Sequence, residues 1–130
     1  MTTLSQQVRA QGFGSVEEFL VYNELRRRGL QPDIDFSYQS PVFGGRLDKG
    51  GLVVDFLFTN PPGLAMNPLG AYWHGTPEAR ARDLLSRALL AGQGITLIFL
   101  DDDAIARDVK YVVGEALNFR DSSRLARGVL

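Results

Sequence analysis

The sequence predicts a single α/β domain with a mixed sheet, and three observations support that class. The 130 residues suffice for one hydrophobic core, and the absence of cysteine excludes a disulfide framework. The apolar period changes from helical to strand-like and back along the chain. The resulting order is helix, three strands, helix, strand, helix. We expect an N-terminal extension at 1–14, the α/β domain at 15–118, and a C-terminal tail or short helix at 119–130.

The segment SVEEFLVYNELRRRGL, residues 15–30, predicts the first helix. Ser15, followed by Glu18 three residues later, is a capping-box pattern, in which two free backbone donors are satisfied at the helix start. Gly29 stands where helices commonly end. The apolar residues expected on the core-facing side are Val16, Phe19, Leu20 and Leu25.

Three strands are expected to follow this helix. In residues 33–44 polar and apolar side chains alternate, as in a half-buried strand. The run LVVDFLFT at 52–59 is rich in β-branched and aromatic residues, which favours a central strand. The NPPG turn at 60–63 then leads into an irregular antiparallel return strand at 64–74. On the first strand, the side chains expected to share one face are Ile34, Phe36 and Tyr38.

The second half of the chain predicts helix, strand and helix. Residues 76–94 begin with the N-cap Thr76 and end in glycine, and their apolar stripe should face the core. Residues 95–101, ITLIFLD, are typical of a strand buried on both faces. Residues 101–117 form the last long helix, with Asp101–Asp103 interpreted as a cap plus solvated acids. The stripe of the 76–94 helix comprises Leu84, Leu85, Ala88 and Leu89.

Composition narrows the classes of function. A net charge of −1 does not indicate a strongly basic nucleic-acid binder. No apolar run reaches the roughly 18 residues of a membrane span, and the first residues lack the pattern of a signal peptide. We therefore expect a protein that is cytoplasmic or virion-associated and not secreted.

A hairpin motif is the most specific feature. The pattern GGxxxxGGxxxDF at 44–56 is followed by GxYWH at 70–74. Together with the flanking helices, over residues 15–118, the chain resembles the restriction-endonuclease-like PD-(D/E)XK superfamily. It is similar to small phage and bacterial very-short-patch-repair and Holliday-junction-resolvase-like nucleases. The resemblance implies an α-β-β-β-α-β-α core with a mixed central sheet flanked by helices.

The resemblance also implies a metal site, which this chain matches unevenly. Members of the superfamily hold Mg²⁺ through hard oxygen ligands to cleave a phosphodiester. Asp55 matches the first ligand, Glu18 (less well Glu17) the helix carboxylate, and Gln39 the polar end of the first strand. The two positions that complete the motif, a second carboxylate and a lysine, are degenerate. They hold Asn67 and Leu69.

A site rebuilt from neighbouring residues is the alternative. Glu78 and Arg82 lie in the following helix, whereas Asp83 is expected to face elsewhere. His74, at the strand end, is a candidate general base or neutral ligand. The competing interpretation makes His74 and its neighbour Trp73 structural, at the edge of the sheet.

These observations lead us to expect a nuclease-fold protein that associates with DNA, or with a phage-type assembly, without cleaving. One alternative is an active Mg²⁺-dependent endonuclease with a migrated site. Another is a structural subunit of a virion or complex, with an apolar protein-binding surface at residues 61–72. A homodimer is possible in each case. The candidate DNA contacts are Arg46, Lys49, Arg80 and Arg82.

Overall fold

The computed structural model describes residues 3–42, 52–70 and 76–128, which form one α/β domain around a four-stranded mixed sheet. The strands lie in the order β1-β2-β3-β4. The first three are antiparallel neighbours, and β4 runs parallel to β3. The bounds are β1 Phe36–Val42, β2 Leu52–Phe58, β3 Leu64–Pro68 and β4 Thr96–Leu100.

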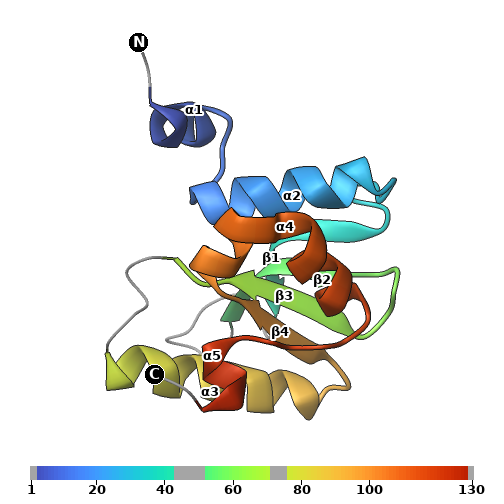
Figure 1. The fold of residues 1–130 in the computed structure, drawn as a ribbon. Helices are drawn as coiled ribbons and strands as arrows, with labels where there is room; N and C mark the ends of the chain where they lie inside the picture. The colour runs from blue at the N-terminus through green and yellow to red at the C-terminus, as the bar shows by residue number, and fades with distance from the viewer. Residues whose placement is uncertain (1–2, 43–51, 71–75, 129–130) are drawn as a thin grey trace.

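Helices cover both faces of this sheet (Figure 1). On one side, α2 (Val16–Arg27) packs against α4 (Asp102–Leu117). On the other side lie α3 (Pro77–Ala91) and the short α5 (Arg124–Arg127). The helix α3 connects β3 to β4, as a parallel pair of strands requires. The predicted fold class, a single α/β domain with a mixed sheet, is therefore confirmed.

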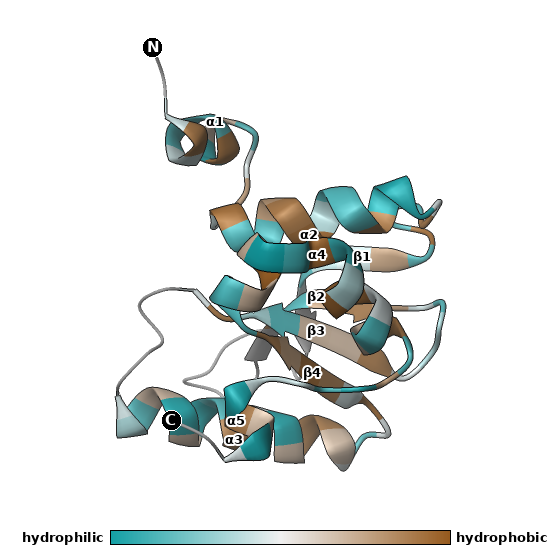
Figure 2. Ribbon diagram, viewed as in Figure 1, coloured by the Kyte–Doolittle hydropathy of each residue, from teal (hydrophilic) through white to brown (hydrophobic). Residues whose placement is uncertain are grey.

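The strands separate two apolar clusters, and Figure 2 shows apolar residues gathered on the strands. The cluster beneath α2 and α4 contains Phe36, Phe56, Met66 and Leu100. The opposite cluster contains Leu69 and other residues against α3 and α5. On β4, Ile98 and Leu100 join the first cluster, and Leu97 and Phe99 join the second. The expected burial of this strand on both faces is confirmed.

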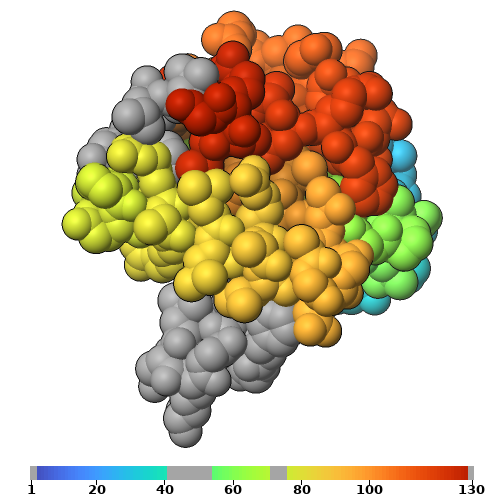
Figure 3. All heavy atoms as spheres, turned by 90° about the horizontal axis from the view of Figure 1, so that it is seen from below, coloured from blue at the N-terminus to red at the C-terminus, as the bar shows by residue number. Residues whose placement is uncertain are grey.

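The predicted apolar stripe of α3 is wrong. Leu84, Leu85 and Leu89 are exposed, with 37%, 60% and 44% of their surface accessible, and Leu90 is the residue of this helix that is buried in the core. Leu90 sets the phase of the helix, so that its half-buried side also carries Arg87 and Asp83, three and seven residues before Leu90. In Figure 3 α3, in yellow, forms a large part of the face seen from below.

Two smaller predictions also need correction. Ile34 is 65% exposed, because residues 33–35 form a turn and β1 begins only at Phe36. Asp101 is the N-cap of α4 by position, but its side chain makes no cap hydrogen bond. Its Oδ2 instead accepts from the backbone N–H of Arg124, at 3.0 Å, and so holds the start of α5.

The segment before the first predicted helix contains a further helix, α1 (Leu4–Ala10). Val8 is its buried anchor, at 1% exposure. Phe13 follows and packs edge-on against Phe19 and Tyr22, with ring centroids 5.3 and 4.9 Å apart. Burial of these apolar groups fixes α1 beside α2. Within the described residues, the helices are all too short or too polar to cross a membrane.

Candidate functional site

Asp55 lies on β2, next to the last residue that pairs with β3. The β2–β3 pairing ends with Phe56 opposite Met66, directly beside Asp55 and Asn67. The backbone N–H of Asp55 donates to the side-chain Oδ1 of Asn67, at 2.8 Å. Along β2, Phe56 packs in the first cluster and Val54 in the second, so the strict alternation of faces is broken at Asp55.

Glu18, in the first turn of α2, is fixed by three neutral donors. Its Oε1 accepts from Tyr38 Oη at 2.6 Å and from Gln39 Nε2 at 2.8 Å, and its Oε2 accepts from Ser15 Oγ at 2.9 Å. The Ser15 half of the predicted capping box is confirmed, because Ser15 Oγ accepts from the Glu18 N–H. The Glu18 carboxylate, however, turns to the side chains of β1. A carboxylate has about four acceptor positions, so these three bonds leave room for one further ligand.

Tyr38 and Gln39, the two β1 residues that donate to Glu18, each have an unusual property. Gln39 has φ of +58°, a left-handed conformation that is uncommon for a residue with a side chain and is found often at functional sites. The pKa of the Tyr38 hydroxyl is raised to about 12 by burial and by its hydrogen bond to Glu18. Tyr38 therefore stays protonated near neutral pH and orients Glu18 as a donor.

Two carboxylates from other elements act on Asp55. Burial is the largest cause that raises the pKa of Asp55 to about 7, followed by the negative charges of Glu18 and then Asp83. Asp83 was expected to face away from the site, and that prediction is wrong. Its position follows from the phase of α3 described above, which no feature of the helix sequence by itself revealed. Glu78, the α3 carboxylate proposed from the sequence, is exposed in the first turn and is not among these causes.

The two degenerate motif positions have structural roles. Asn67 uses its carbonyl oxygen on the backbone of Asp55, as described above. Leu69 is only 5% exposed and packs in the second cluster, while its N–H donates to Leu100 O at 2.8 Å. The apolar residues around it, on β3, were also expected to form an exposed partner surface. Leu64, Ala65 and Met66 are instead fully buried.

The remaining candidates divide into two groups. Arg80 is half-buried and Arg82 is exposed, both on α3. His74, Trp73, Arg46 and Lys49 lie outside the described residues. The structure thus brings Asp55, Glu18 and Gln39 into one neighbourhood, adds Tyr38 and Asp83 to it, and leaves the predictions for the hairpin histidine and the glycine-rich loop as they were.

The donor chemistry of this neighbourhood suits a hard cation such as Mg²⁺ in part. Asp55 and Glu18 supply carboxylate oxygens, and Mg²⁺ takes its remaining ligands readily from water and phosphate. A nearby cation would also offset the mutual repulsion that raises the pKa of Asp55. Within residues 3–42, 52–70 and 76–128, no three side chains of the His, Asp and Glu types stand together as a ready-made metal cluster.

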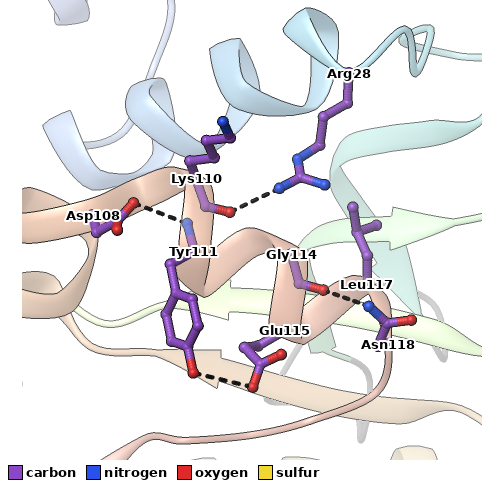
Figure 4. Close-up of a pocket in the computed structure, with 8 residues that line it drawn as sticks. All are labelled: Arg28, Asp108, Lys110, Tyr111, Gly114, Glu115, Leu117 and Asn118. Atoms are coloured by element: carbon purple, nitrogen blue, oxygen red, sulfur yellow. Dashed lines mark hydrogen bonds between the residues drawn. The ribbon is translucent and has the colours of Figure 1, made fainter.

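Two hollows in the described surface are lined by residues of α4, and Figure 4 shows the first of them. One, of about 490 Å³, lies between Arg28 at the end of α2 and residues 108–118. Arg28 crosses it to donate to Lys110 O at 2.7 Å, and an added Cβ at Gly114 would come within 3.0 Å of Arg28 Nη2. A glycine at 114 thus lets Arg28 join the two helices. The second hollow lies between α4 and α5.

Comparisons with protein-family models, with curated proteins and with solved structures found no match for this chain. The PD-(D/E)XK resemblance therefore remains a prediction from the sequence. The structure itself defines a small α/β domain in which a half-buried aspartate lies close to acidic side chains from two helices.

Proposed function

We propose that the protein is a nuclease-fold protein that associates with DNA and does not cleave it by the ordinary hairpin chemistry. The observation that carries this proposal is the position of Leu69. Its side chain is part of the core at the place where the resemblance expects a water-positioning lysine. A core residue has no access to a substrate phosphate, and Asn67 adds no charge for a metal.

The order and direction of the strands support the part of this proposal that concerns the fold. A helix, three antiparallel strands, a crossover helix and a parallel fourth strand is the order that the resemblance implies. The polar network of Glu18, Tyr38 and Gln39 beside Asp55 is consistent with a site kept after its lysine was replaced.

Purified protein tests the proposal with labelled duplex and branched DNA. We expect binding that weakens linearly on a plot of log K against log salt, because phosphate contacts release counterions. We expect no cleavage above that of an Asp55→Asn control in Mg²⁺ or Mn²⁺. If the protein shows no salt-dependent binding at low ionic strength, the proposal that it associates with DNA is wrong. If it shows robust metal-dependent cleavage, the proposal that it does not cleave DNA is wrong.

A second candidate is a metal-dependent endonuclease with a rebuilt site, and the acidic surroundings of Asp55 favour it. Asp55 and Glu18 would hold the cation, and the bound metal would activate water and polarise the phosphate. Asp83 would then supply the negative charge that the missing motif carboxylate normally provides, and Gln39 would orient the substrate side of the site.

The two candidates differ in one measurement. Mg²⁺ or Mn²⁺ titration by calorimetry, with a DNA oligonucleotide present, should show binding that Asp55→Asn and Glu18→Gln each abolish if the site is rebuilt. Asp83→Asn should weaken it and Glu78→Gln should leave it unchanged, because of these two α3 carboxylates it is Asp83 whose charge acts on Asp55. No detectable metal binding under these conditions would exclude this candidate.

A further inference from the structure

The hollow between α4 and α5 combines an exposed aromatic ring with arginines. It measures about 350 Å³, at the lower end of the range of small-ligand pockets. Tyr111 on α4 lines it together with Arg107 from the same helix and Arg127 from α5. Residues from two successive helices therefore line one hollow.

The ring of Tyr111 is held in place although it is 62% exposed. Asp108 has non-helical backbone angles and interrupts α4, and its Oδ1 accepts from the Tyr111 N–H at 3.0 Å, so Asp108 caps the second half of the helix. At the other end of the side chain, Tyr111 Oη donates to Glu115 Oε1 at 3.4 Å (Figure 4). The Asp108 bond fixes the backbone at Tyr111 and the hydroxyl bond orients its exposed ring, and a side chain that is already oriented loses less freedom when a flat ligand stacks on it.

The acids that line the hollow already have partners among the described residues, whereas two of its arginines have no acidic partner there. Asp101 accepts from the Arg124 N–H, and Asp103 lies 3.3 Å from Arg124 Nη1, so both acids are already engaged. Arg107 and Arg127 are exposed, and in the described part of the chain neither has an acidic partner. Two guanidinium groups are thus available to an anion beside the ring, and guanidinium is well suited to phosphate.

We infer that this hollow binds an unpaired nucleotide of a DNA strand, with the base stacked on Tyr111 and its phosphate between Arg107 and Arg127. An aromatic platform flanked by cations is the arrangement that single-stranded nucleic acids use, since every base has a face to stack and every linkage a charge. The choice of DNA as ligand rests on the proposed function. The surface is separate from the neighbourhood of Asp55, so a strand could be held there whether or not the acidic site cleaves.

Three variants and a control test this inference with fluorescein-labelled oligo(dT), a duplex of the same length, and free thymidine monophosphate. Tyr111→Ala should bind oligo(dT) about 5- to 100-fold more weakly, and Tyr111→Phe should bind like wild type because it keeps the ring. Arg107→Ala combined with Arg127→Ala removes one phosphate contact and should reduce the slope of log K against log salt by about 0.7, whereas Arg26→Ala, another exposed arginine, should not. Melting curves confirm folding; Tyr111 is mostly exposed, so Tyr111→Ala should fold normally.

Each contrary result identifies what has failed. If Tyr111→Ala binds oligo(dT) as wild type does while wild type still binds duplex, the inference is wrong and the proposed DNA association stands. If wild type binds neither DNA, both fail. Equal affinity for free thymidine monophosphate and for oligo(dT) would overturn the assignment of a strand as the occupant.

Discussion

Replacement of Asp55 by asparagine should stabilise the protein at neutral and alkaline pH. The carboxyl group is half-buried beside Glu18 and Asp83, and its pKa is raised from 3.8 to about 7. The folded protein therefore binds this proton more tightly than the unfolded chain does. Stability should fall as pH rises from about 4 to about 7 and change little from this source above that. Asparagine has the same shape without the charge, and the backbone bond to Asn67 remains.

The size of the effect follows from the shift. About 3 pKa units at 1.36 kcal/mol each give about 4 kcal/mol, and a shift one unit smaller gives about 3 kcal/mol. We expect Asp55→Asn to exceed wild type in free energy of unfolding by about 2–4 kcal/mol at pH 8 and to match it near pH 4. For a domain of this size that corresponds to a rise in Tm of about 7–15 °C at pH 8.

Urea unfolding followed by circular dichroism at pH 4, 5, 6, 7 and 8 measures this difference. Glu78→Gln serves as the matched control, because it removes an exposed carboxylate from α3 and should change stability little at any pH. An advantage of Asp55→Asn that is the same at pH 4 and pH 8, or a loss of stability at pH 8, would refute the reasoning.

Further substitutions test the surroundings. Leu69→Lys should lower the free energy of unfolding by about 3 kcal/mol or more and give no cleavage activity, because it places a charge in the core. Leu85→Lys should change stability by no more than about 0.5 kcal/mol, since 60% of this side chain is exposed; a large loss would restore the predicted core-facing stripe. Asn67→Ala should lower the free energy of unfolding by about 1–2 kcal/mol, because the N–H of Asp55 loses its acceptor. Asn67→Asp keeps an acceptor but adds a negative charge, so it should raise the pKa of Asp55 further, which NMR titration can measure.

The sequence was sufficient for the order of the elements from α2 to α4, because their signals are local, although it did not predict α1. Ser15 and Thr76 cap the helices they were expected to cap, and the apolar run of β4 is buried on both faces. The NPPG turn separates β2 from β3 as expected. Caps, turns and apolar periods depend on residues within a few positions of one another, so they can be predicted without knowledge of the rest of the chain.

The sequence also predicted part of the site. Asp55, Glu18 and Gln39 were chosen together, and the structure brings Gln39 and Glu18 into hydrogen-bond contact and makes the charge of Glu18 act on Asp55. Tyr38 was expected only to pack on a strand face. Adjacent side chains on a regular strand point to opposite faces, so the choice of Gln39 gave no signal for Tyr38. Both side chains reach Glu18 where Gln39 has φ of +58°.

Only the tertiary structure decided which way α3 faces. Its leucines gave a clear stripe, yet they are exposed, and the opposite side carries Asp83 toward the charge of Asp55. The orientation of a helix about its axis is set by what it packs against, here through Leu90, and not by its own composition. Likewise, Tyr111 and Arg127 line one hollow only because the start of α5 lies beside the start of α4, held by the buried Asp101. Such contacts join residues far apart in the chain, so no local pattern contains them.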